Sequence, residues 1–126
     1  MGNCLILNKS SSSFKVNVIR NWIGRWQGQT LTRDFTATRK CIIIWVSGSF
    51  SRQWYVTIPG GTTTGGTILY SNGVGERWPT GDGNESTAGY IRTDIVYLPK
   101  GSTYNNSWTA GSAYPLGSEL FVEIYS

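Results

Sequence analysis

The sequence predicts an all-β protein, an antiparallel β-sandwich of jelly-roll or Greek-key type, formed by residues 1–126 as a single domain. Its 16 glycines, with β-branched residues and clusters of Ser, Thr and Asn, interrupt every window long enough for an amphipathic helix. Short runs in which apolar and polar residues alternate recur at intervals typical of sandwiches. Charged residues make up only 14% of the chain, below the roughly 25% usual for soluble domains, so hydroxyl and amide groups dominate the expected surface.

The first half of the chain predicts five strands before a glycine-rich region. Residues 4–8 and 14–19 are the first two, and Phe14, Val16 and Val18 share one face of the second. Residues 31–37 form the third strand, after a wetter stretch that carries two tryptophans. Residues 40–47 form the fourth, and the following Gly-Ser pair predicts a tight reversal into a strand at residues 53–58.

The fourth of these strands is apolar on both faces, since residues 41–46 read CIIIWV without a polar residue. Alternate side chains of a strand point to opposite faces, so a strand with one wet face should alternate instead. A second sheet covers one face of this strand in a sandwich. A further layer is needed for the other, and a loop or another subunit are the candidates.

The second half begins with residues 59–89, which hold nine of the 16 glycines and predict a long loop broken by one short strand at residues 67–70. Residues 90–98 alternate and predict a strand with Arg92 and Asp94 on the same face. Residues 99–101 predict a turn, and residues 102–118 a second long loop. The last strand, residues 119–125, is expected to point Leu120, Val122 and Ile124 inward.

The composition excludes several kinds of chemistry. The chain has no histidine, which removes Ser-His and Cys-His nucleophiles and the commonest zinc ligand, so we expect no cofactor and no metal. The net charge of +4 is scattered and no nucleic-acid-binding motif is present, so no nucleic-acid partner is expected. No apolar run approaches the roughly 18 residues of a membrane span, so no membrane insertion is expected.

The acidic residues leave catalysis as an alternative, and the two cysteines leave a disulfide as an alternative. Glu76, Asp82 and Glu85 could pair as the two carboxylates of a polysaccharide-cleaving enzyme, but flexible glycine-rich backbone positions catalytic groups poorly. We therefore expect no enzyme. Cys4 and Cys41 each lie at an apolar run, so two buried thiols are expected rather than a disulfide.

Aromatic rings in the two long loops are the most informative candidates for binding. Flat rings beside amide and charged groups suit the apolar face and hydroxyls of a sugar, and Trp, Tyr and Arg also dominate protein hot spots. The alternative is that these rings fold back to cap the core. The predicted stacking residues are Trp78, Tyr104, Trp108 and Tyr114, with Arg77, Asp82, Asn84 and Asn106 as polar partners.

The order FTATRKCIIIWVSGS, a glycine-rich middle, YIRTDIVYLPKGSTY and a closing LFVEIYS, over about residues 30–126, resembles the receptor-binding tips of bacteriophage tail fibres and similar trimeric adhesin heads. Lectin heads and tumour necrosis factor-like jelly rolls show similar strings. The resemblance implies a non-catalytic homotrimer, on a virion surface or extracellular, that binds a cell-surface glycan or receptor protein. It also implies that Ile42, Ile44 and Val46 form the subunit interface, the alternative being a loop folded over them. A free-standing lectin and a structural or capsid jelly roll are the alternative functions.

Overall fold

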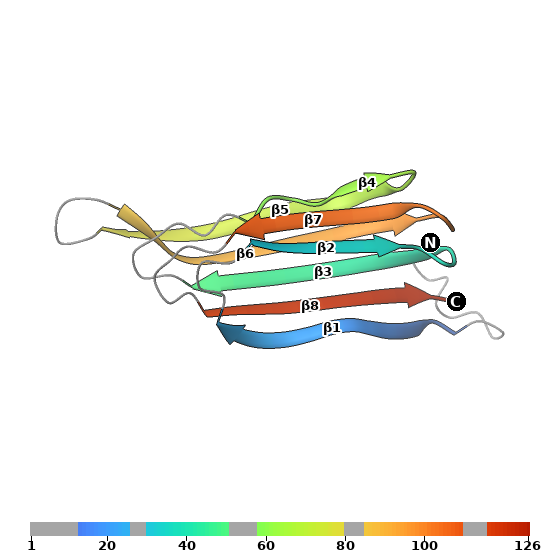
Figure 1. The fold of residues 1–126 in the computed structure, drawn as a ribbon, viewed down its shortest axis with the longest axis horizontal. Helices are drawn as coiled ribbons and strands as arrows, with labels where there is room; N and C mark the ends of the chain where they lie inside the picture. Colours follow the sequence, from blue (N-terminus) through green and yellow to red (C-terminus); the bar gives the residue numbers. More distant parts are fainter. Residues whose placement is uncertain (1–12, 26–29, 51–57, 80–84, 110–115) are drawn as a thin grey trace, which may run out of the picture.

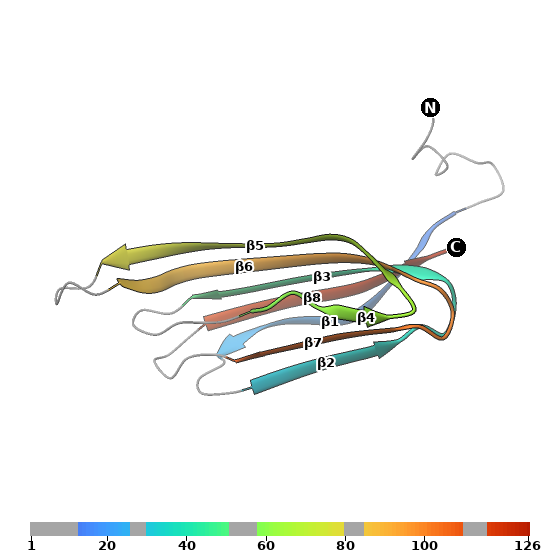
Figure 2. The same ribbon diagram turned by 90° about the horizontal axis from the view of Figure 1, so that it is seen from above.

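A computed structural model describes residues 13–25, 30–50, 58–79, 85–109 and 116–126, and eight strands lie within these ranges. All pairings are antiparallel, and two sheets lie face to face as layers (Figures 1 and 2). This arrangement confirms the predicted all-β antiparallel sandwich. The larger sheet has the order β1 (Lys15–Arg25), β8 (Leu116–Tyr125), β3 (Cys41–Phe50), β6 (Glu85–Leu98), β5 (Thr67–Pro79), and the smaller has the order β2 (Thr30–Thr36), β7 (Thr103–Thr109), β4 (Thr62–Thr64).

The core lies between the two sheets and takes its largest side chains from the central strands. Trp45 from β3 and Phe121 from β8 are buried on the larger sheet, and Tyr104 from β7 meets them from the smaller sheet. The rings of Tyr104 and Phe121 make an edge contact at 5.9 Å between centroids, a geometry that aromatic pairs favour. Nine buried residues form the cluster: Ala37, Cys41, Ile43, Trp45, Ile58, Val96, Leu98, Tyr104 and Phe121.

Strand β3 is the central strand of the larger sheet, as its continuous apolar run suggests. Its residues Cys41, Ile43 and Trp45 are buried against the smaller sheet, while Ile42 and Ile44 are half-buried on the opposite face. Cys41 is a free, buried thiol, which confirms its predicted state; Cys4 lies outside the described residues. The strand continues to Phe50, so the reversal predicted after residue 47 is wrong. Most of the expected partner strand at residues 53–58, and the strand at 4–8, lie outside the described residues.

The glycine-rich middle is the main departure from the sequence prediction. Most of it is not loop, since β4, β5 and the start of β6 occupy it. Glycine is required here because Tyr90 of β6 lies across the neighbouring strand. A Cβ on Gly73 would meet the Tyr90 hydroxyl at 2.2 Å, and one on Gly75 would meet its ring at 2.7 Å. The glycines thus make room for an aromatic ring within a strand, a close approach that glycine permits.

Two predictions in the last third hold and two fail. The turn at residues 99–101 is present, with Gly101 at a positive φ of 88° and the Ser102 amide donating to the Pro99 carbonyl. Arg92 and Asp94 also lie on the same face of the strand, as predicted. The loop predicted at 102–118 is wrong over Thr103–Thr109, which form β7.

The facing of β8 is opposite to the prediction. Glu119, Phe121 and Glu123 are buried between the sheets, whereas Leu120 is 41% exposed and Val122 is half-buried on the outside. The reason is that arginines on other elements reach the two carboxylates and compensate their burial.

Candidate functional site

The eight predicted ligand-binding residues do not form one surface. Tyr104 is 1% exposed and packs in the core, and Asn106 is equally buried with its amide donating to the Pro59 carbonyl at 2.8 Å. A ring and an amide buried between two sheets present no face to a ligand, so these two residues are corrected to core residues. Asp82, Asn84 and Tyr114 lie outside the described residues.

Three of the predicted residues keep a place on the backbone near strand ends. Arg77 and Trp78 lie at the end of β5, and Trp108 lies near the end of β7; the structure describes their strand positions and not their side chains. Arg77 pairs with Thr87 and Trp78 with Ser86 on β6. Trp108 pairs with Leu31 on β2, so it belongs to the other sheet.

Arg77 and Trp78 are part of a hairpin arm that extends beyond the rest of the larger sheet. The last pair between β3 and β6 is Phe50 with Gly89, whereas β5 and β6 stay paired as far as Pro79 with Glu85. We call residues 77–79 and 85–88 the arm; within the described residues it has no partner strand on the β3 side, and it projects from one end of the sandwich (Figure 1). At about 3.4 Å per residue it extends roughly 10–13 Å.

The base of the arm is braced by a side-chain ladder on β6. Tyr90 packs against the core cluster and lies across Gly73 and Gly75 of β5. Arg92 and Asp94 follow Tyr90 by two and four residues on the same face of β6. Arg92 donates to the Ser71 hydroxyl at 2.7 Å, and Ser71 donates to Asp94 at 2.6 Å. Tyr90 therefore holds β5 against β6 close to the point where the arm leaves the sheet, and Arg92 and Asp94 hold the two strands together further along.

The face of the larger sheet that points away from the smaller sheet is here called the outer face, and apolar side chains from all five strands lie on it. Figure 2 shows the smaller sheet on one side only of the larger. Residues directly paired across strands share a face, so the registers define rows on the outer face. One row consists of Val16, Ile124, Ile42, Tyr97 and Thr67, and the next of Val18, Val122, Ile44, Ile95 and Tyr70.

The outer face continues without charge for two further rows. The third consists of Asn21, Leu120, Val46, Thr93 and Asn72, and the fourth of Ile23, Ser118, Gly48, Ile91 and Val74. Several of these aliphatic side chains are more than half exposed, including Val16, Val18, Ile23, Val74 and Ile91. The described residues of the region 59–89 do not form a loop over Ile42, Ile44 and Val46, since residues 62–64, 67–79 and 85–89 belong to strands of the two sheets.

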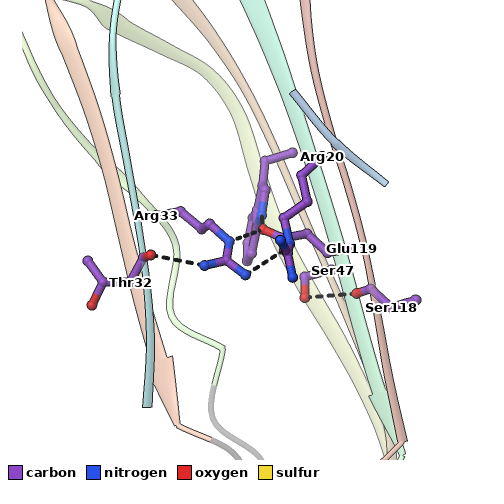
Figure 3. Close-up of polar contacts among 7 residues, drawn as sticks. Arg20, Thr32, Arg33, Ser47, Ser118 and Glu119 are labelled. Carbon is purple, nitrogen blue, oxygen red and sulfur yellow. Dashed lines mark hydrogen bonds and ion pairs between the residues drawn. The ribbon is translucent and has the colours of Figure 1, made fainter. Parts of the chain in front are cut away.

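The inner face of the larger sheet carries buried charged groups. We call Glu119 and the three side chains that donate to it the Glu119 cluster (Figure 3). Arg33 of β2 donates to both carboxylate oxygens of Glu119, from Nε at 2.7 Å and from its terminal nitrogen at 2.9 Å. Arg20 of β1 donates from Nε at 2.7 Å, and the Trp45 indole N–H donates at 2.9 Å. One carboxylate on β8 thus binds groups from three other strands in both sheets.

These contacts set the protonation of Glu119. Burial on its own raises the pKa of a carboxyl, but here the hydrogen bonds from Arg33 and Trp45 and the charges of Arg33 and Arg20 outweigh it. The pKa of Glu119 is consequently below its usual value. The bidentate Arg33 fork is the strongest of these contacts because both of its N–H groups meet an ionised acceptor.

Two further buried carboxylates are partnered in the same manner. Arg39 donates to Glu123 from two nitrogens at 3.1 and 3.3 Å and lies 3.4 Å from the centroid of the Tyr125 ring. Burial raises the pKa of Glu123, but the hydrogen bonds from Arg39 and Asn17 lower it by more. The pKa of Glu123 is therefore below its usual value. Asp94 accepts from the Tyr104 hydroxyl at 2.6 Å, from the Gly61 amide at 2.7 Å and from Ser71.

Sequence reasoning missed these carboxylates as structural groups. The available signal was the period-two spacing of Glu119, Phe121 and Glu123, which places two acids beside a buried ring. In the described residues no group of His, Cys, Asp and Glu side chains is arranged to hold a metal ion, and no helix there could cross a membrane. Comparison with protein-family models, with curated protein sequences and with solved structures finds no match in any of the three.

Proposed function

We propose that the chain is a non-catalytic receptor-binding or adhesion module, the head of a trimeric fibre, and that the arm of β5 and β6 contacts the receptor. The observation that carries the proposal is the arm itself. It projects past the sheet, bears Arg77 and Trp78, and is braced at its base by Tyr90. A preorganised element of this kind binds with little loss of conformational freedom.

The state of the buried acids supports binding over catalysis. Glu119, Glu123 and Asp94 each accept hydrogen bonds from fixed partners, and Arg33 and Arg39 hold two of them ionised. A general acid of a glycosidase needs a raised pKa instead. Two of the acids named for the enzyme alternative lie at different levels of the β5–β6 hairpin, since Glu85 pairs with Pro79 and Glu76 with Gly89; Asp82 lies outside the described residues.

The chemistry of the arm favours a surface receptor as ligand. Tryptophan and arginine are the side chains most enriched in binding hot spots, and a tryptophan ring also stacks on sugar C–H faces. We therefore propose a cell-surface glycan or protein as receptor. A free-standing lectin remains the second candidate, favoured if the arm binds sugar while the protein is a single copy in solution.

The test uses fluorescently labelled protein on a glycan array and on a panel of bacterial strains. Binding lost after periodate treatment of the cells identifies a glycan, and binding lost after protease treatment identifies a protein. Trp78→Ala and Arg77→Ala should each weaken binding about 30-fold or more, as hot-spot residues do, with the melting temperature nearly unchanged.

Lys100→Ala is the matched control, because Lys100 is an exposed cation in the turn after β6, at the opposite end of that strand. It should bind as the wild type does. The proposal fails if the arm variants bind normally, or if the wild type binds neither cells nor array. Release of reducing ends from a polysaccharide would favour the enzyme alternative.

A further inference from the structure

The outer face of the larger sheet presents a broad surface without charged residues, with many exposed aliphatic side chains. Its two most apolar rows run across all five strands, from Val16 to Tyr97 and from Val18 to Tyr70. At about 4.8 Å between strands and about 3.4 Å per residue, the four rows cover roughly 25 Å by 27 Å. The projected area is about 650 Å², and the two most apolar rows make up about half of it; the largest apolar patch on a typical monomer is roughly 300–600 Å².

We infer that this outer face is an interface between copies of this chain, which buries Ile42, Ile44 and Val46 together with their neighbours on β1, β8, β6 and β5. The inference names the contact surface of the oligomer in the proposed function, whether two copies meet face to face or three surround an axis, and does not depend on what the arm binds. A stable interface buries about 800 Å² on each partner, which the outer face nearly supplies by itself.

The charge pattern indicates a second copy as the occupant. The four rows contain no charged residue, so two identical faces meet without like-charge repulsion, whereas a charged partner would find nothing to pair with. Asp94 of β6 and Glu119 and Glu123 of β8 lie on the inner face with cationic or hydroxyl partners. The next row of paired residues toward the arm contains Arg25 and Glu76, so the uncharged area consists of the four rows.

Residues 1–12, the longest stretch of the printed sequence outside the described ranges, are too few to cover the outer face. Residues 1–12 lie outside the described residues and include an apolar stretch, CLIL. Twelve residues laid down as one strand cover a width of about 5–10 Å, against roughly 25 Å across five strands. A second five-stranded sheet packed face to face, about 10 Å away, matches the full width.

The experiment measures the mass of the full chain in solution by sedimentation and light scattering over a range of concentrations. The wild type should weigh a multiple of the 13.9 kDa chain mass. Leu120→Glu and Ile91→Glu each place a charge on the outer face at residues that are 41% and 57% exposed in a single copy, so each copy should still fold. Either variant should raise the dissociation constant at least about 100-fold, because an unpaired charge becomes buried on assembly.

Ser107→Glu is the matched control. Ser107 is exposed on β7, on the solvent side of the smaller sheet, so the same charge there should leave the mass unchanged. Hydroxyl-radical footprinting of the wild type needs no variant: oxidation of Tyr70, 48% exposed in one copy, should fall severalfold on assembly.

A wild-type mass of one chain at micromolar concentration overturns the inference. So does an oligomer that both glutamate variants leave intact, since it would use another surface. A dimer supports the interface and contradicts the trimer of the proposed function. Loss of receptor binding by Trp78→Ala with unchanged mass separates the two proposals from each other.

Discussion

Replacement of Glu119 by glutamine is the most direct perturbation of the sandwich. The carboxylate is 1% exposed and accepts two hydrogen bonds from Arg33, one from Arg20 and one from the Trp45 indole. Glutamine has nearly the same shape but no charge, and only one of its two terminal atoms can accept. Two guanidinium groups would then face one another across the core without an anion between them.

The cost can be worked from these contacts. Removing one member of a buried ion pair costs about 3–5 kcal/mol, because the remaining charge stays buried without compensation. Arg33, with 18% of its side chain exposed, carries most of this effect, while Arg20 at 40% can turn toward water. A loss of this size is a large part of the roughly 5–15 kcal/mol that holds a domain folded.

The assay is unfolding in urea and by heat, at one protein concentration for all variants. Glu119→Gln should lower the free energy of unfolding by about 3–5 kcal/mol and the melting temperature by about 10–20 °C. Asp34→Asn, at an exposed acid on β2, is the control and should change stability by less than about 0.5 kcal/mol. A further Arg33→Met substitution should recover part of the loss, since it removes the uncompensated charge. A loss below about 1 kcal/mol for Glu119→Gln would refute the reasoning.

The remaining predictions concern titration and single contacts. The pKa values of Glu119 and Glu123 are lowered in the fold, so their contribution to stability is complete above the ordinary carboxyl value of 4.5 and is lost as the pH falls below it; the melting temperature should drop there, less steeply in Glu119→Gln. Burial raises the pKa of the Cys41 thiol to about 11, so a thiol reagent at pH 8 should react slowly with Cys41 until denaturant is added, and fast labelling of the native protein would contradict its burial. Tyr104→Phe removes the hydroxyl that donates to Asp94 at 2.6 Å and should cost about 1–3 kcal/mol in urea unfolding; an unchanged midpoint would mean that water replaces the bond.

The candidate binding residues divide into buried and uncovered positions, and the sequence of a single strand does not indicate which a residue will be. Tyr104 and Asn106 are suited to binding by residue type, but they lie on the inward face of β7. Arg77 and Trp78 lie where β5 extends beyond the described end of β3. Whether a position is covered depends on the length and offset of strands that come from distant parts of the chain. The choice between core and surface for an aromatic residue was therefore beyond the reach of its local pattern.

Local patterns by themselves determined the all-β class, the central place of β3 and the turn at residues 99–101. Each depends on neighbours in the chain: alternation, an unbroken apolar run, and a Pro-Lys-Gly sequence that reverses the backbone. Tertiary structure alone decided that the glycine-rich middle forms β5 and that β8 turns its acids inward. Those outcomes require Tyr90 to lie over Gly73 and Gly75, and arginines from other strands to neutralise Glu119 and Glu123. Such contacts join residues far apart in sequence, so their energies enter only when the sheets close.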